Sequence, residues 1–150
     1  MTLVLERRQV NAIRQHGEAD YPAEACGLIG GTVEDGRKVA VLLVPLVNQR
    51  TDAARNRYLI DPESFRRAQE KLDRDGLEVI GVYHSHPDHA AAPSTFDREH
   101  AWPWLSYVIV GVARGRAGEM TSWTLSDDRA AFDEESITIE EQKAVWQSPS

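Results

Sequence analysis

The sequence is poor in cysteine, with Cys26 as its one cysteine among 150 residues. A single cysteine excludes an intrachain disulfide and any zinc site built from several cysteines. Long apolar runs are also absent. The most apolar stretch, residues 39–47, contains Pro45 and is far shorter than the roughly 20 residues that a membrane-spanning helix needs.

Basic residues are in the minority, because 17 Lys and Arg face 24 Asp and Glu, for a formal charge of −7. Such a balance disfavours general affinity for nucleic acid or for anionic membranes. The first residues also give no secretory signal, since Glu6, Arg7 and Arg8 precede any apolar segment. We therefore predict a cytoplasmic protein with no nucleic-acid partner and no membrane partner.

The remaining composition is that of an ordinary globular protein, 41% hydrophobic and 27% charged. The length favours one domain, which we place at residues 1–140, with residues 141–150 as a C-terminal tail. Helical and extended patterns alternate along the chain. This alternation predicts an α/β (α+β) fold, in which helices pack on the faces of a mixed β-sheet.

The expected elements follow from apolar periodicity and from turn and capping residues. We expect one helix that ends at Gly17 and a second that begins with Asp61 as N-cap and Pro62 in its first turn and ends at Gly76. Strands are predicted at residues 3–5, 25–29 (closed by Gly30 and Gly31), 38–44 (after a turn at Asp35 and Gly36), 58–60, 77–83, 105–113, 120–125 (after a turn at 115–118) and 136–140 (an edge strand). The helices are predicted at 7–16 and 62–75 with a short turn after Pro93, and 48–56 is predicted to be a loop near the site.

The most informative stretch is residues 78–97, where an apolar strand runs into His84-Ser85-His86-Pro87. Side chains alternate along a strand, so His84 and His86 are expected to lie on the same face. A carboxylate returned to them by a short loop would complete three ligands for a divalent metal. Three protein ligands with a fourth position left open are typical of catalytic zinc.

Asp97 is the candidate third ligand, but its spacing from Ser94 has a second interpretation. Ser-x-x-Asp is close to a capping box, in which the serine oxygen accepts from a backbone N–H at a helix start. We expect that one carboxylate oxygen cannot serve fully as both cap and ligand. His89 and His100 are rival ligands, although an exposed loop or helix histidine is the commoner role, and Asp88 fits a turn cap better.

A metal hydrolase also needs a group that takes a proton from water and passes it to the leaving amine. Glu24 is the candidate, because it directly precedes a predicted buried strand and is expected to be partly desolvated. Its alternative role is that of an ordinary exposed loop acid.

Taken together, these residues resemble the JAMM (MPN+/JAB domain) zinc metalloproteases. The match comprises His84-x-His86-Pro87, Ser94-x-x-Asp97, and an upstream Glu24 in Pro-x-Glu-x-Cys-Gly. The resemblance implies that His84, His86 and Asp97 bind one Zn²⁺ per chain and that Glu24 is the acid/base. It also implies that Ser94 donates a hydrogen bond to the oxyanion, a contribution of about 3 kcal/mol in comparable sites.

The family resemblance further implies a curved, mixed sheet like that of cytidine deaminases. The implied chemistry is hydrolysis of a peptide or isopeptide bond after the C-terminal Gly-Gly of a ubiquitin-like protein. In length the chain is most similar to short bacterial members that act on ubiquitin-like sulfur-carrier proteins. We expect such a carrier as the partner, and a homodimer is compatible with the sequence.

Other classes of protein share parts of this pattern. A nucleobase deaminase would need a Pro-Cys-x-x-Cys motif, which a single cysteine excludes, and the His-Glu-x-x-His motif of zincins is absent. Two histidines and a carboxylate also occur in non-haem iron oxygenases. A non-catalytic module that binds a ubiquitin-like tail is a further alternative.

Overall fold

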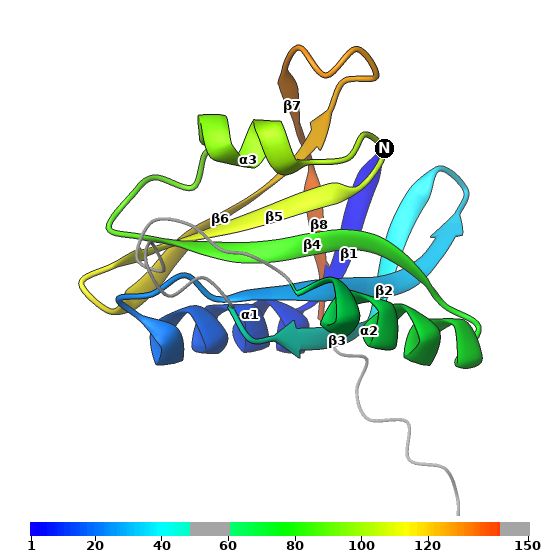
Figure 1. Cartoon of the computed structure of the whole chain (residues 1–150), viewed down its shortest axis with the longest axis horizontal. Helices are drawn as coiled ribbons and strands as arrows, with labels where there is room; N and C mark the ends of the chain where they lie inside the picture. Colours follow the sequence, from blue (N-terminus) through cyan, green and yellow to red (C-terminus); the bar gives the residue numbers. More distant parts are fainter. Residues whose placement is uncertain (49–60, 142–150) are drawn as a thin grey trace, which may run out of the picture.

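The computed structural model describes residues 1–48 and 61–141, and in these residues eight strands form a single sheet (Figure 1). The strand order is β7-β6-β5-β4-β2-β3-β1-β8, so strands far apart in the sequence are neighbours. The elements are β1 (Thr2–Glu6), α1 (Arg7–Asp20), β2 (Cys26–Glu34), β3 (Arg37–Leu46), α2 (Pro62–Arg74), β4 (Glu78–Pro87), α3 (Thr95–His100), β5 (Ser106–Ala113), β6 (Arg116–Leu125), β7 (Phe132–Glu135) and β8 (Ile137–Glu140).

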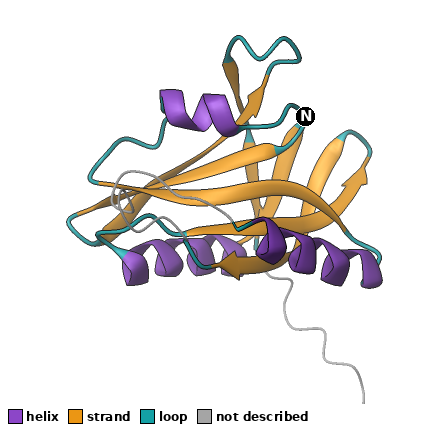
Figure 2. Cartoon of the chain, in the orientation of Figure 1, coloured by secondary structure: helices purple, strands orange, loops and turns teal. Residues whose placement is uncertain are grey.

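The sheet is mixed, as the sequence predicts. Strand β4 pairs antiparallel with β2 and parallel with β5, and β1 pairs parallel with both β3 and β8. Figure 2 shows the strands curving across the molecule with helices packed against them. The predicted α/β (α+β) class, a mixed curved sheet flanked by helices, is therefore confirmed.

Two apolar clusters hold the helices to the sheet. Val10 and Ile13 of α1 are buried in the first cluster, to which β4 contributes Tyr83. Ala68 of α2 lies in the second cluster, to which β4 contributes Val82. Because adjacent residues of a strand point to opposite faces, β4 contributes side chains to both clusters. The face of β4 that holds Val82 also holds His84 and His86.

Helix α2 begins and ends as predicted. The Asp61 carboxylate accepts a hydrogen bond from the Ser64 N–H at 3.2 Å, and Pro62 occupies the first turn. Gly76 follows the last turn with a φ of +73°, a conformation that glycine adopts without strain. The predicted turn at Asp35 and Gly36 is also confirmed, since both have positive φ between β2 and β3.

The first helix is longer than predicted, because it passes through Gly17 and continues to Asp20. Gly17 is a contact residue rather than a stop. A Cβ at Gly17 would lie 3.1 Å from Val112 Cγ2 and 3.3 Å from Ser85 Cβ, so the missing side chain lets α1 approach β4 and β5 closely.

The predicted end of a strand at Gly30 and Gly31 is wrong for a similar reason. Strand β2 continues to Glu34 through a register shift at these glycines, and a Cβ on Gly31 would lie 2.0 Å from the Val39 carbonyl oxygen. Close backbone approach at a bulge is a common use of glycine in strands. Glycine-based prediction therefore misplaced two element boundaries.

Three further differences from the prediction are two shifted strand boundaries and one strand that was not predicted. The turn predicted at 115–118 lies at residues 114–115, so β6 begins earlier than expected. Strand β7 was not predicted, because its sequence is Phe followed by three acids. The 77–83 strand extends to Pro87 and thus includes the histidine motif. The predicted edge strand at 136–140 is confirmed as β8.

The predicted strand at 58–60, most of the 48–56 loop and the tail from residue 142 lie outside the described residues. Within the described ranges, no helix has both the length and the apolar character that crossing a membrane requires.

Candidate metal centre

Two histidines on β4 form the centre of the site. His84 and His86 are both buried, with 0% and 7% of their surface exposed. Their Nε2 atoms lie 3.1 Å apart, and their ring centroids are separated by 4.9 Å. The alternation of the strand thus places both imidazoles on one face, as the sequence predicts, with the same nitrogen of each ring directed at a common point.

Asp97 approaches this point from the first turn of α3. Its Oδ1 lies 3.2 Å from His84 Nε2, and its Oδ2 lies 3.2 Å from His86 Nε2. The capping box is formed as well, because Ser94 Oγ accepts from the Asp97 N–H at 3.1 Å and Asp97 Oδ2 accepts from the Ser94 N–H at 2.8 Å.

Capping and contact with the histidines therefore coexist in one carboxylate, and whether one oxygen can serve as both cap and metal ligand stays a prediction. A carboxylate oxygen has two lone pairs and can accept from two directions. In addition, Oδ1 of Asp97 takes no part in the cap. The cap fixes the orientation of the Asp97 carboxylate instead of diverting it.

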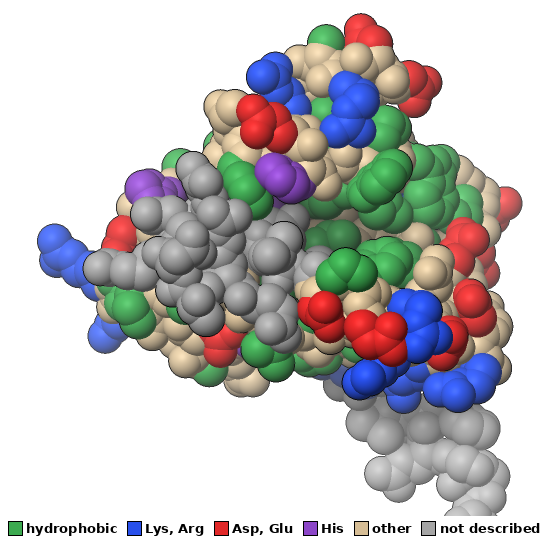
Figure 3. Space-filling model, in the orientation of Figure 1, with side chains coloured by type: hydrophobic (Ala, Val, Ile, Leu, Met, Phe, Trp, Pro, Cys, Tyr) green, Lys and Arg blue, Asp and Glu red, His purple; other side chains and the backbone are tan. Residues whose placement is uncertain are grey.

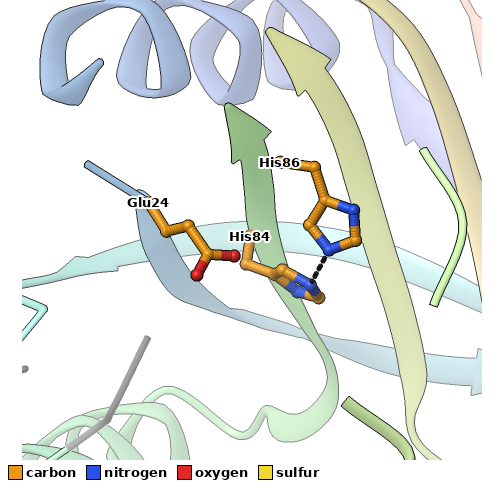
Figure 4. A group of neighbouring side chains, drawn as sticks. All are labelled: Glu24, His84 and His86. Carbon is orange, nitrogen blue, oxygen red and sulfur yellow. Dashed lines mark hydrogen bonds between the residues drawn. The ribbon is translucent and has the colours of Figure 1, made fainter. Parts of the chain in front are cut away.

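Glu24 lies just before β2 and is only 2% exposed. One carboxylate oxygen of Glu24 and one ring nitrogen each of His84 and His86 all lie within 4.8 Å of one another. Figure 4 shows the Glu24 side chain directed toward the two imidazoles from the neighbouring strand. The structure thus brings Glu24 to the histidines across about 60 residues of sequence, and the alternative of an exposed loop acid is excluded.

The protonation pattern favours a cation at the centre of this cluster. His86 Nδ1 lies 2.9 Å from the Ala90 carbonyl oxygen, which can only accept, so Nδ1 carries the proton. In a neutral imidazole the Nε2 of His86 then presents a lone pair. A lone pair facing a carboxylate and a second imidazole is stabilised by a metal ion. Such a hydrogen bond to the second ring nitrogen is common in metal-binding histidines.

The spacing of the donor atoms also fits a metal. Ligands bound at about 2.1 Å in tetrahedral geometry lie roughly 3.4 Å from one another. His84 Nε2 and His86 Nε2 lie 3.1 Å apart, and each lies 3.2 Å from a different oxygen of the Asp97 carboxylate. The donor set therefore fits an ion of this size with little movement, and the Glu24-His84-His86 cluster also indicates a metal site.

The two buried histidines differ in their electrostatics. Burial would lower the pKa of His86, but its hydrogen bonds to Asp97 and to the Ala90 carbonyl outweigh burial and raise that pKa above its usual value. Burial lowers the pKa of His84 below its usual value. Burial would likewise raise the pKa of Asp97, but the hydrogen bonds to His84 and His86 outweigh it and hold that pKa well below its usual value. An ionised carboxylate beside a neutral imidazole is the form in which both ligands bind metal.

The rival histidines do not share this position. His89 is exposed in the loop after β4. His100 is also exposed, with Nδ1 2.9 Å from the Phe96 carbonyl oxygen and its ring stacked on Phe96. Asp88 caps a turn, as expected, and accepts from the Arg114 N–H at 2.8 Å.

A hollow lies beside α3 on the same side of the sheet. It has a volume of about 640 Å³ and is lined mainly by apolar side chains, among them Phe65 of α2 and Phe96 of α3. Apolar side chains gather around this hollow in Figure 3. The segment after α3 contributes Trp102, which is 69% exposed. An open apolar surface of this kind next to the candidate centre is suited to a large substrate.

Sequence reasoning assigned no role to Ser85 or Asn48, both of which contact the backbone at Glu24 and Ala25. The Ala25 N–H donates to Ser85 Oγ at 2.8 Å, and Asn48 Nδ2 donates to the Glu24 carbonyl oxygen at 3.1 Å. The available signal was weak: a hydroxyl residue on the buried face of a strand, which implies a hydrogen-bond partner.

A mixed sheet with a strand-borne histidine pair, a capped aspartate and a buried glutamate defines a candidate metal-dependent enzyme with a JAB-like fold. Residues 6–126 match the family described as prokaryotic homologs of the JAB domain. The chain belongs to this family.

Several named proteins are similar to the chain over most of its length. A desampylase from Haloferax volcanii is 34% identical over 85% of this chain and 86% of its own. A probable TtuB-protein conjugate cleaving protease from Thermus thermophilus is 33% identical over 78% and 75%. A CysO-cysteine peptidase from Mycobacterium tuberculosis is 30% identical over 93% and 92%.

Solved structures also match nearly the whole chain. A solution structure from Salinibacter ruber has 37% identity and a TM-score of 0.73, covering 99% of this chain and 97% of that one. A solution structure from Desulfitobacterium hafniense has a TM-score of 0.81 at 28% identity, covering 95% and 94%.

Proposed function

We propose that this chain is a zinc-dependent peptidase of the JAMM type. Its reaction is hydrolysis of the bond after the C-terminal Gly-Gly of a ubiquitin-like or sulfur-carrier protein. The observation that carries this proposal is the convergence of two imidazole nitrogens and a carboxylate at 3.1–3.2 Å, with the buried Glu24 beside them. The relatives named as a desampylase, a conjugate cleaving protease and a CysO-cysteine peptidase support the substrate class.

His84, His86 and Asp97 are the residues that would hold the zinc ion. Zinc is favoured because it binds histidine nitrogen and carboxylate oxygen in a tetrahedral arrangement, with three ligands supplied by protein in catalytic sites. When bound, zinc supplies Lewis acidity and lowers the pKa of a coordinated water to about 7. Glu24 stays outside this ligand set, because the Asp97 carboxylate already completes three close donors.

Glu24 carries the proton in this reaction. Its carboxylate accepts a proton from the attacking water as the water oxygen bonds to the scissile carbonyl carbon. It then delivers the same proton to the amine nitrogen as the carbon–nitrogen bond breaks. The second proton of the water then passes from the new carboxyl group to the released amine, so the products are a carrier that ends in a free Gly-Gly carboxylate and an ammonium group. Its burial keeps solvent from competing for the proton.

Ser94 is the residue that we propose to stabilise the oxyanion. Its oxygen accepts from the Asp97 N–H, so its own proton remains to be donated toward the reacting carbonyl oxygen. We expect Ser94→Ala to lower kcat by roughly 10²-fold, the loss seen for an oxyanion donor. Steady-state kinetics on the purified variant test this expectation.

Ser94→Ala also removes a helix cap, which costs about 1 kcal/mol of stability. Asp61→Ala provides the matched control, since it removes the N-cap of α2, which contributes no residue to the candidate metal centre. Asp61→Ala should lower the thermal midpoint by a similar amount and leave kcat unchanged. Equal activity losses in both variants would assign Ser94 a capping role alone.

The proposed function is tested by incubating the purified protein with carrier proteins extended past Gly-Gly and weighing the products. We expect a product whose mass is that of the carrier ending at Gly-Gly. Formation of this product should stop when the metal is chelated and resume when zinc is added. A carrier ending in Ala-Ala serves as the control substrate. An unchanged carrier mass with stoichiometric zinc present would overturn the peptidase proposal.

Measuring the metal content of the purified protein separates the peptidase from the alternative functions. Stoichiometric iron would favour the oxygenase, and absence of metal together with tight binding of the carrier tail would favour a non-catalytic module. The cytoplasmic location, the single domain at residues 1–140 and the homodimer stay predictions.

A further inference from the structure

The peptide group between Glu24 and Ala25 is held on both sides by side chains. Its carbonyl oxygen, which belongs to Glu24, accepts from Asn48 Nδ2 at 3.1 Å. Its N–H, which belongs to Ala25, donates to Ser85 Oγ at 2.8 Å. Ser85 comes from the middle of the His84-x-His86 motif, whereas Asn48 follows the end of β3. One peptide plane is therefore fixed from two separate elements.

Ser85 occupies a position that packing alone would give to an apolar residue. It is 1% exposed and faces α1, where Gly17 approaches its Cβ, on the side of β4 that faces away from the histidines. The neighbouring side chains there include Val110 and Val112. Burying a hydroxyl among such groups is unfavourable unless it is hydrogen-bonded. The bond to the Ala25 N–H accounts for a serine at this place.

The same bond marks the point where β2 leaves the sheet. Regular pairing between β2 and β4 ends at Cys26 opposite His84. One residue further, the Ser85 N–H still donates to the Ala25 carbonyl oxygen at 3.0 Å, but the return bond from the Ala25 N–H goes to the Ser85 side chain. Because the Ser85 side chain replaces a backbone acceptor of the β2–β4 ladder, the regular pairing of the two strands ends immediately after Glu24.

Position matters here because Glu24 acts on a proton. Groups that transfer protons must lie within hydrogen-bond reach of their target, and a misplacement of about 1 Å can cost roughly 10²-fold in rate. A side chain on a segment outside the regular sheet has no ladder to fix it. The Glu24 backbone therefore needs another anchor, and the two bonds to its peptide group provide one.

We propose that Ser85 and Asn48 are positioning residues that set the Glu24 carboxylate against the metal site by clamping the Glu24–Ala25 peptide plane. This proposal rests on the proposed function, in which Glu24 carries the proton. The hydrogen bonds described above for Ser85 and Asn48 go to the backbone of this peptide group and not to the donor atoms of the candidate metal ligands.

The test compares Ser85→Ala, Asn48→Ala and the double variant with the parent enzyme. Each single change should lower kcat by about 10- to 100-fold, with KM within a factor of about two, since uniform binding is untouched. Zinc content should remain at the parental level. Because both residues hold one peptide plane, the loss in the double variant should fall well short of the product of the single losses.

Ser122→Ala is the matched control for Ser85→Ala. Ser122 is also a fully buried strand serine, and its hydroxyl donates to Glu135 Oε1 at 2.7 Å, away from Glu24. Both changes remove one buried hydrogen bond and should lower the thermal midpoint, but only Ser85→Ala should lower kcat. Equal kcat values in the two variants, at equal zinc content, would overturn the clamp.

Hydrogen exchange at the Ala25 amide gives a readout that does not depend on activity. Exchange should accelerate in Ser85→Ala and in Asn48→Ala, and stay at the parental rate in Ser122→Ala. A parental Ala25 amide rate in both clamp variants would also overturn the proposal. If the parent hydrolyses no carrier while Ala25 exchange responds as expected, the error lies in the proposed function and not in the clamp contacts.

Discussion

Replacing Glu24 by glutamine is expected to lower kcat by about 10³-fold or more while zinc stays at one ion per chain. The carboxylate is the proton carrier in the proposed reaction, and general acid–base groups contribute roughly 10²- to 10⁴-fold. Glutamine has the same shape as glutamate, so the buried position keeps its packing. Metal analysis of the purified variant and single-turnover kinetics on an extended carrier measure the two effects separately.

The control for Glu24→Gln is Glu34→Gln, which removes an exposed acid at the other end of β2. It changes the net charge equally and should leave kcat at the parental value. Full activity in Glu24→Gln would remove Glu24 from the mechanism. Loss of zinc in Glu24→Gln would instead make Glu24 a ligand, a role that its distance from both imidazoles also permits.

The parts of the site that sequence could predict are those set by local geometry. The face shared by His84 and His86 follows from strand alternation, and the position of Asp97 follows from the cap that it forms with Ser94. Both relations span only a few residues. The structure places all three side chains within 3.2 Å of a neighbour in the cluster, as the motif implies.

The parts that sequence could not predict depend on contacts between distant segments. Nothing near Glu24 in the sequence indicates that Ser85 and Asn48 hold its backbone, because those bonds form only when β2, β3 and β4 lie side by side. Glycine was ambiguous for the same reason. Gly17 resembles a helix stop locally, yet its role is to admit β4 and β5 against α1.

Replacing His86 by alanine is expected to remove both the metal and the activity. One of three close donors is lost, so zinc affinity should fall by more than about 100-fold, which is the upper range for removing even a supporting hydrogen bond. Zinc stabilises the folded parent by binding it preferentially. The thermal midpoint of the parent should therefore rise on adding zinc, whereas that of His86→Ala should not respond.

The matched control is His89→Ala, which removes an exposed histidine three residues further along the chain. It should retain one zinc per chain, full activity and the zinc-dependent rise in thermal midpoint. The His86 change also removes one hydrogen bond to the Ala90 carbonyl oxygen, which still accepts from the Ala92 N–H at 2.8 Å, at a cost of about 0.5–1.5 kcal/mol. The metal-free proteins must therefore be compared first by circular dichroism. A folded His86→Ala that keeps zinc and turnover would show that other residues hold the ion. Loss of zinc and turnover in His89→Ala would identify His89 as a ligand.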